Sequence, residues 1–484
     1  MYAPTNAGGT VTAIAVNGPS TTTPNKKKTK KASGAPSAQK TSLAFRWADS
    51  LLKGAFGEFS TEIHSNGAQM VYRWNNAYWQ EVNEAEGHAM VARWLTVVDP
   101  QSAKAGAAKD AWAFGAMRLF DAKRKPEATS DFVIPCLNAY LRITDDATIH
   151  VEAPDKALGL THATKVTVAT PVGQTHTPKP MPEDCLLARF LNRSLPDKEV
   201  QAFVQELSAM SFIPRNYGMV GTFFGPPSAG KSTFVNILSA FHARPACVSL
   251  HKLDDGFGLE QIIDSTFIQV DEVETKKWCE ATFKSLATGD PITINRKHRT
   301  PIAAYRNRAM IFMTSNHSPF VTDNSGGVYR RMAPVHWNVT VPEAERIIDL
   351  HKKIFEQEAD IFMDWVLEGV QRLMKRGRFL IESEWPEEIR RLKENIRYSN
   401  DHVGAWMRDC DVSYGSNEPI AKDVVYANFA TWCDEEGRVQ LEPNVFWREV
   451  SRRPGFEGVT QRIQARVGVR RVSVVNITIG SKTI

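Results

Sequence analysis

The most constraining feature of the chain is the segment Gly-Pro-Pro-Ser-Ala-Gly-Lys-Ser at residues 225–232. Its spacing, G-x-x-x-x-G-K-S, is typical of a loop whose backbone N–H groups surround the phosphates of a nucleotide. The β-branched and aromatic residues at 220–224 predict a strand before the loop, and residues 233–241 have the spacing of a helix. The free N–H groups and the dipole at the start of that helix would favour a bound phosphate.

The loop predicts a site for ATP and Mg²⁺. Lys231 is placed to reach the outer phosphates, and the hydroxyl of Ser232 is placed to hold the metal ion. The residues assigned to nucleotide binding are Gly225, Pro226, Pro227, Ser228, Ala229, Gly230, Lys231, Ser232 and Thr233.

Two carboxylates follow a second predicted strand, at residues 266–270. In a nucleotide triphosphatase, Asp271 would join Ser232 as a metal ligand, and Glu272 would orient and polarise the attacking water. The alternative is an Asp-Glu pair that ends a strand at the surface. The phosphate loop upstream favours the catalytic roles.

A third hydrophobic stretch, residues 309–315, ends at the amide of Asn316, which is predicted to sense the γ-phosphate. Arg330 and Arg331 follow within Gly-Gly-Val-Tyr-Arg-Arg. An arginine at the γ-phosphate would stabilise charge in the transition state, and hydrolysis would require assembly if it came from a neighbouring subunit. A solvent-exposed arginine pair is the alternative.

A basic turn lies between the second and third strands. The arms of a predicted hairpin contain Ile292, Ile294 and the residues after Thr300, and its tip holds Arg296, Lys297, His298 and Arg299. Such a tip beside an ATPase core can grip a phosphodiester backbone. No aromatic residues interleave with the tip, so backbone contact is favoured over base stacking. The alternative is a solvated basic turn.

The order GPPSAGKST, FIQVDE, FKSLATGDPITINRKHRT, MIFMTSN and GGVYRRM resembles that of the superfamily 3 helicases. Residues 218–338 are similar to the helicase portion of phage and plasmid primase-helicases and their poxvirus relatives. The Arg-Lys-His triplet also resembles the DNA-binding hairpin of the papillomavirus and polyomavirus replicative helicases. The segment Ile134-Pro-Cys-Leu-Asn-Ala-Tyr-Leu and the tryptophan-bearing hairpin carry a looser likeness, over residues 60–210, to the accessory domain of such helicases.

The resemblance implies an α/β fold with an AAA+-like ATPase core. It implies a homo-oligomeric, hexameric ring that encircles single-stranded DNA, moves 3′ to 5′ and hydrolyses ATP between subunits. Carried over to this chain, Asn316 is the sensor, Arg330 the arginine supplied in trans with Arg331 as second choice, and Lys297 and His298 the pair that contacts DNA. The tail and accessory region fill the 200 or so residues before the loop, and neither zinc-binding cysteines nor a paired-carboxylate polymerase site is found there, so no primase activity is expected.

Length and composition set the domain organisation. A chain of 484 residues is too long for one ordinary domain. We expect a disordered basic tail at 1–40, an accessory or oligomerisation domain at 41–204 and the ATPase core at 205–340. These precede a helical region at 341–410 and a winged-helix-like DNA-binding domain at 411–484. The tail contains six lysines and no acid, which suits a nucleic-acid arm, a nuclear-import signal or a solvated tail equally.

Local patterns predict elements outside the core. A hairpin is expected at 70–79, helices at 85–97 and 103–120 with Ser102 as N-cap, strands at 134–143 and 147–152, and an extended linker at 171–182. An apolar face through residues 361–374 indicates a core or subunit contact. Helices at 422–435 and 445–453 precede a hairpin at 462–479. Residues 441–484 hold eight basic and three acidic side chains, so a DNA footprint and a solvated charged face remain open.

The cysteines form no C-x-x-C pair, so a reducing compartment is expected. Neither a membrane span nor a secretion signal is found, and the bacterial host cytoplasm is the expected location. The sequence thus predicts a replicative DNA helicase of a phage or other mobile element. Its expected partners are single-stranded and forked DNA and a separate primase or other replication proteins. An ATP-switched origin-binding initiator or loader is the alternative, and a packaging or defence ATPase a weaker one.

Overall fold

The structure is a computed structural model that describes residues 41–63, 69–249, 257–271, 279–297, 299–317, 321, 326–416, 418–460, 463–467 and 470–480. The chain divides into two units, Met1–Ser42 and Leu43–Ile484. The predicted basic tail, residues 1–40, lies outside the described residues, and everything below concerns the second unit. No helix of the described residues is both long enough and apolar enough to cross a membrane.

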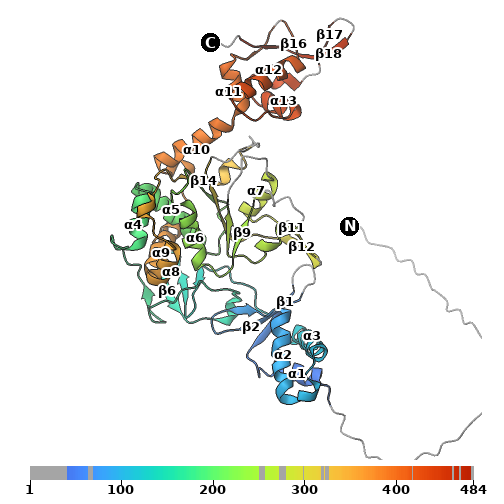
Figure 1. Cartoon of the computed structure of the whole chain (residues 1–484), viewed down its shortest axis with the longest axis vertical. Helices are drawn as coiled ribbons and strands as arrows, with labels where there is room; N and C mark the ends of the chain where they lie inside the picture. The colour runs from blue at the N-terminus through green and yellow to red at the C-terminus, as the bar shows by residue number, and fades with distance from the viewer. Residues whose placement is uncertain are drawn as a thin grey trace, which may run out of the picture. The chain divides into compact units, whose positions relative to one another are not determined.

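The centre of the fold is a five-stranded sheet in which every neighbouring pair is parallel, and the order is β14-β8-β13-β10-β9 (Figure 1). The strands are β8 (Val220–Phe224), β9 (Pro245–Val248), β10 (Phe267–Val270), β13 (Met310–Ser315) and β14 (Met332–His336). The predicted α/β class is confirmed at this level. Strand β8 is buried at all five positions, as expected for a parallel sheet covered on both faces.

Alternation along the strands sorts side chains between two cores. On β8, β10 and β13, Phe223, Phe267 and Phe312 point to one face and pack with the helices α4, α5, α6, α8 and α9. Their neighbours, among them Ile268 and Ile311, point to the other face and pack with α7 and α10. These helices are α4 (Leu186–Ser194), α5 (Lys198–Met210), α6 (Lys231–Phe241), α7 (Glu280–Thr288), α8 (Leu350–Gln357), α9 (Ala359–Arg376) and α10 (Glu387–Asn400).

Helix α9 carries the apolar stripe predicted at residues 361–374. Phe362, Trp365, Val366 and Val370 are buried in the first core, where α9 packs against α5. The stripe is therefore core within the subunit.

The region before the core contains two further sheets. Strands β1 (Phe59–Ile63), β2 (Gln69–Trp74) and β3 (Trp79–Glu81) form an antiparallel sheet beside the helices α1 (Leu43–Leu52), α2 (Glu84–Val98) and α3 (Ala105–Ala122). Strands β4 (Val133–Pro135), β5 (Tyr140–Ile143), β6 (Ile149–Glu152) and β7 (Thr175–His176) form the second. Residues of this second sheet belong to the same hydrophobic core as α4, α5 and α6.

Two local predictions in this region were wrong. The expected strand at 134–143 is two antiparallel strands, β4 and β5, because the chain turns at 136–139. Ser102 does not cap α3: it closes a 3-10 turn and donates to Asp99, and Lys104 stands at the N-cap. The expected linker contains β7, whose His176 lies 2.7 Å from Asp364 of α9.

The C-terminal region has a hydrophobic core of its own. Its helices are α11 (His402–Asp409), α12 (Lys422–Glu435) and α13 (Pro443–Ser451). Strand β18 (Arg470–Val475) pairs with β16 (Ile420–Ala421) and β17 (Ile463–Val467), and β15 (Ser413–Tyr414) pairs with β19 (Ile477–Thr478). The two predicted helices and the hairpin are present.

Candidate nucleotide-binding site

The predicted phosphate loop joins the end of β8 to the start of α6. Gly225 and Gly230 have φ of 144° and 97°, backbone conformations that favour glycine. A Cβ on Gly225 would lie 2.0 Å from the carbonyl oxygen of Trp337, so this position has no room for a side chain. Gly230 is the N-cap of α6, and the N–H groups of the first turn of that helix therefore start at the loop.

The remaining loop residues divide by exposure. Pro227, Ser228 and Ser232 are exposed, whereas Ala229 and Lys231 are buried. The backbone N–H of Val341 donates to the carbonyl of Ser228 at 3.1 Å and holds the tip of the loop. The exposed Ser232 hydroxyl at the start of α6 is open to a ligand.

Lys231 is the central cation of the site. Its ammonium donates to the carbonyl oxygens of Gly225 at 2.7 Å and Pro226 at 2.8 Å, and to Oδ1 of Asn316 at 3.3 Å. Burial lowers the pKa of Lys231. Because a buried cation needs hydrogen-bond acceptors, these three oxygens hold the side chain against its own loop. A phosphate would offer the ammonium the same type of acceptor with added negative charge.

Asp271 lies directly after β10, on the second strand from β8. Both of its carboxylate oxygens accept from Nε2 of Gln269 at 2.8 Å, and Oδ1 also accepts from the hydroxyl of Thr314 at 3.1 Å. The thiol of Cys247 lies 3.6 Å from Oδ2, and burial raises its pKa. The hydroxyl of Ser232 and the carboxylate of Asp271 are the oxygen donors that Mg²⁺ prefers, so the donor types fit the predicted metal.

Sequence reasoning missed Gln269, Thr314 and Cys247. Gln269 and Thr314 stand on strands already predicted, two residues before Asp271 and Asn316 respectively. Only the pairing of β10 with β13 shows that they share a carboxylate. Glu272, the predicted water-orienting carboxylate, lies outside the described residues.

The strand order explains why Lys231, Asn316 and Asp271 lie on the same edge of the sheet. In the parallel sheet β8, β13 and β10 are consecutive neighbours, so their carboxyl ends lie along one edge. That edge carries Lys231 after β8, Asn316 after β13 and Asp271 after β10. Ligands of open α/β sheets bind outside the carboxyl ends of the strands, which makes this edge the candidate site.

The two arginines of the predicted trans pair differ in environment. They lie in the 3-10 turn Tyr329–Arg331 just before β14. Arg330 is exposed. Arg331 is half-buried and donates to the carbonyl of Gly327 at 2.5 Å, and burial lowers its pKa. Arg330 is therefore the one available to a second molecule.

The predicted basic hairpin is present as β11 (Ile292–Arg296) and β12 (Arg299–Tyr305), with Arg296 opposite Arg299. Lys297 at the turn is exposed, and its backbone N–H donates to Glu260 at 3.2 Å. His298 lies outside the described residues. The tip therefore lies at the end of a paired hairpin, as the sequence predicted.

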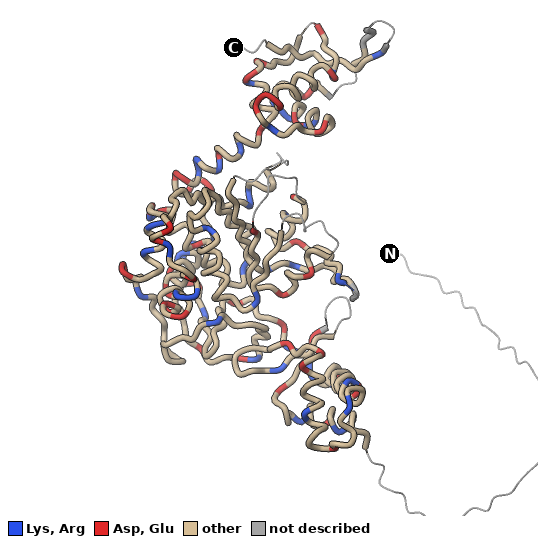
Figure 2. The backbone as a smooth tube through the Cα atoms, viewed as in Figure 1, with Lys and Arg blue, Asp and Glu red and all other residues tan. Residues whose placement is uncertain are grey.

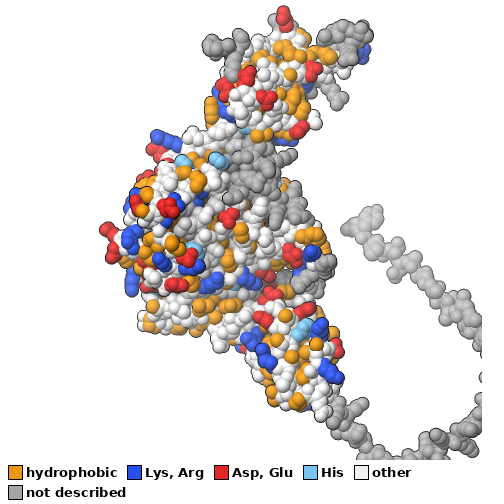
Figure 3. All heavy atoms as spheres, in the orientation of Figure 1, with side chains coloured by type: hydrophobic (Ala, Val, Ile, Leu, Met, Phe, Trp, Pro, Cys, Tyr) orange, Lys and Arg blue, Asp and Glu red, His pale blue; other side chains and the backbone are white. Residues whose placement is uncertain are grey.

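Three arginines of the C-terminal region contact acidic residues. Arg448 and Arg452 both contact Glu449, and Arg453 contacts Asp401. Over the described residues, Lys and Arg interleave with Asp and Glu (Figure 2), and the visible surface shows the same mixture (Figure 3). A DNA footprint and a solvated charged face both remain open for this region.

Comparison with known proteins gives one family match. A family model described as "Family of unknown function (DUF5906)" matches residues 223–331, the stretch from the end of β8 to the arginine pair. No curated protein matches the chain.

Among solved structures, the apo structure of the NrS-1 C terminal region has a TM-score of 0.48 at 13% identity, covering 91% of this chain and 100% of that one. An A form apo structure of the same region has a TM-score of 0.43 at 13% identity, covering 90% and 100%. At these values the likeness assigns neither an activity nor a partner to this chain.

Proposed function

We propose that the chain is an ATP-dependent DNA helicase of the superfamily 3 type, acting in replication of a phage or other mobile element. The observation that carries the proposal is the carboxyl edge of the sheet. There the ammonium of Lys231 donates to its own loop and to Asn316, which follows β13, and Asp271 follows the adjacent strand β10. A phosphate loop, a metal carboxylate and a polar sensor are the parts that hydrolysis of a nucleoside triphosphate requires.

In this proposal each residue has one role. The backbone of Gly225–Gly230 and the start of α6 bind the phosphates, and Lys231 turns from the loop carbonyls to the outer phosphates. Ser232 and Asp271 would hold Mg²⁺, which neutralises charge on the phosphates when bound. Asn316 positions the γ-phosphate or the water, and Glu272 accepts the proton of the water.

Two further features support a motor that acts on DNA. Lys297 lies exposed at the turn of a paired hairpin, where it can contact a phosphodiester backbone. Arg330 is exposed beside the same core, where a neighbouring subunit in a ring can be reached. We therefore propose a hexameric ring on single-stranded DNA with ATP at the subunit interfaces.

The decisive experiment measures ATP turnover with and without single-stranded DNA, and strand displacement on a forked duplex. Lys231→Ala should lower turnover by at least about 100-fold, because one preorganised charge contact in a catalytic site contributes that much. Lys353→Ala removes an exposed lysine of α8 and serves as the matched control. Full turnover in Lys231→Ala would refute the site. DNA-stimulated turnover without strand displacement would favour the initiator or loader.

A further inference from the structure

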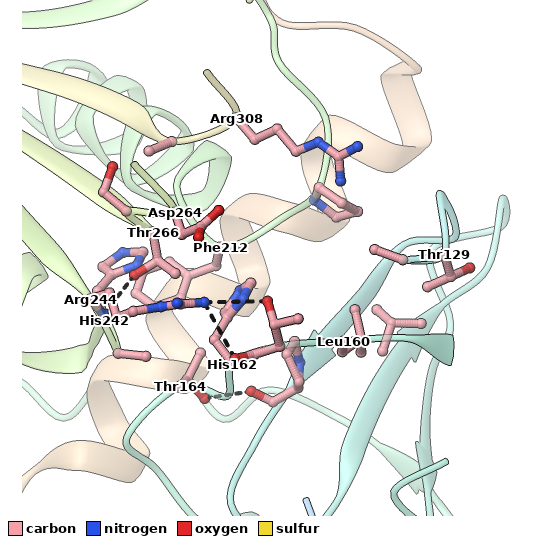
Figure 4. A pocket seen from close by; sticks show the side chains of 18 of the residues that line it. Thr129, Leu160, His162, Thr164, Phe212, His242, Arg244, Asp264, Thr266 and Arg308 are labelled. Atoms are coloured by element: carbon pink, nitrogen blue, oxygen red, sulfur yellow. Dashed lines mark hydrogen bonds between the residues drawn. The ribbon is translucent and has the colours of Figure 1, made fainter. Parts of the chain in front are cut away.

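A cavity of about 470 Å³ (Figure 4) lies at the amino ends of β9, β10 and β13. Lys231 stands at the opposite, carboxyl edge of the same sheet. Its wall includes residues just before β9, β10 and β13, the segment after α5, and loops of the accessory region. The volume is within the range of sites for small organic ligands. None of the predicted site residues contributes to it.

Three polar groups of the wall have no hydrogen-bond partner within the part of the chain that the structure describes. The His162 ring points into the centre of the cavity, and Arg308 lies exposed at its upper side (Figure 4). The Ser265 hydroxyl is buried without a partner. Because buried polar groups are almost always paired, the unpaired Ser265 hydroxyl, beside the His162 ring and the exposed Arg308, indicates that this wall suits a polar ligand.

Arg244 provides a second cation between these groups. Its guanidinium donates to the carbonyl and hydroxyl of Thr161 at 3.4 and 3.3 Å and lies 4.0 Å from Glu81. Such long contacts leave the guanidinium able to take a stronger acceptor. Lys125 also lines the cavity but is already paired with Glu62 at 3.2 Å. Arg306, also in the wall, donates to the carbonyl of Gly289 at 3.1 Å, so Arg244 and Arg308 are the lining cations that we assign to an anion.

The rest of the wall suits the other parts of a nucleotide. Burial lowers the pKa of His162 to about 4, so its neutral ring offers one donor and one acceptor at neutral pH. Tyr305 presents a half-buried ring whose hydroxyl donates to Ile262 at 2.8 Å. The carboxylates of Asp264 and Glu127 also line the cavity and can accept from an exocyclic amine or a sugar hydroxyl.

We propose that this cavity binds one nucleotide unit, with its phosphate at Arg244 and Arg308 and its base beside His162 and Tyr305. The unit comes either from single-stranded DNA or from a free nucleotide. In the first case the inference rests on the proposed function. Tyr305 ends β12, so the cavity lies at the base of the hairpin that carries Lys297, and a strand held there would stay close to the basic tip.

The test uses the full-length protein without ATP and two probes. One is a fluorescent 20-nucleotide single strand, followed by anisotropy, and the other is a deoxynucleoside monophosphate, followed by calorimetry. Arg308→Ala and His162→Asn should each weaken binding of the responsive probe by about tenfold, the effect of losing one charged or stacking contact. Arg93→Ala, an exposed arginine of α2, is the matched control and should bind as the parent does.

A single strand carrying 5-iododeoxyuridine locates the contact independently. Photocrosslinks to peptides around His162 or Tyr305 support the cavity with DNA as the source. Binding of the monophosphate that is lost in Arg308→Ala supports it with a free nucleotide as the source. Unchanged affinity of both probes in both variants, with crosslinks confined to the hairpin tip, overturns the proposal. None of these measurements uses ATP turnover, so their outcome can be interpreted even if the chain does not hydrolyse ATP.

Discussion

At the scale of single residues, the phosphate loop depends on positions where only glycine fits. Gly225 combines a φ of 144° with a carbonyl oxygen 2.0 Å from where a Cβ would lie. Gly377 at the end of α9 has a φ of 71° and nothing within 4 Å of its Cβ position. Comparing alanine substitutions at the two glycines therefore separates the cost of a left-handed backbone from the cost of a steric clash.

We predict that Gly225→Ala lowers the free energy of unfolding by clearly more than Gly377→Ala. Gly377→Ala should lower the free energy of unfolding by about 1 kcal/mol, because it only places an alanine in a left-handed backbone conformation. Gly225→Ala should cost more, because its Cβ would also displace the carbonyl of Trp337. It should abolish nucleotide binding as well. Thermal melting and nucleotide titration measure both effects. Equal destabilisation by the two variants would show that the loop is looser than described.

His242 gives a pH prediction at the same scale. Burial lowers its pKa to about 3, and its ring stacks on Phe212 with centroids 4.4 Å apart. An unfolded histidine takes up a proton below about pH 6.5, while the folded one stays neutral until near pH 3. Stability is therefore fully present above pH 6.5 and falls as the pH drops from about 6.5 towards 3.

We predict that going from pH 7 to pH 5 costs up to about 2 kcal/mol through this residue. His242→Phe, which keeps an aromatic ring between Phe212 and Phe267, should reduce the loss measured by urea unfolding. His88→Phe, at a half-buried histidine of α2, is the matched control. A His242→Phe variant as acid-sensitive as the parent would contradict the prediction.

At the scale of elements, the β11–β12 hairpin joins the basic turn to a rigid support. Ile294 of β11 and Ile302 of β12 are buried, so the strands of the hairpin pack on the core while Lys297 stays exposed. The anchor for Lys297 is its backbone contact with Glu260, which leaves the side chain free for a partner.

We predict that Lys297→Ala keeps most of the basal ATP turnover. It should lower strand displacement on forked DNA by about tenfold, because the hairpin tip loses one phosphate contact. The slope of the logarithm of the DNA-binding constant against the logarithm of the salt concentration should fall in magnitude by about 1, the contribution of one phosphate contact. Displacement kinetics beside a turnover assay measure the uncoupling, with Lys353→Ala as control. Parallel loss of both activities would instead assign Lys297 to the nucleotide site.

At the scale of the whole molecule, the proposed function places each nucleotide site between two copies of the chain. Arg330 is exposed, whereas Arg331 donates to the carbonyl of Gly327. We therefore propose Arg330 as the arginine that reaches the γ-phosphate bound to a neighbouring subunit.

Mixing two inactive variants tests it. We predict that Lys231→Ala and Arg330→Ala are each inactive alone, yet mixed oligomers recover part of the turnover. Each mixed interface that pairs an intact Lys231 with an intact Arg330 from its neighbour is complete. Recovery that rises and falls with the mixing ratio supports the trans role. Mixtures no more active than either variant would place Arg330 within its own subunit.

Sequence determined the loop, the strand ends, the basic turn and the arginine pair, because each is local: glycine conformations, alternating apolar residues and turn chemistry act over a few neighbours. The split of β4 from β5 and the capping of α3 were misjudged, since a short apolar run does not reveal where a chain reverses. Tertiary structure alone decided that Thr314 and Gln269 share Asp271, that Arg331 is held to Gly327 while Arg330 is exposed, and that His162, Arg244 and Arg308 line one cavity. These residues are brought together by strand order and helix packing, which depend on contacts between segments far apart in the sequence.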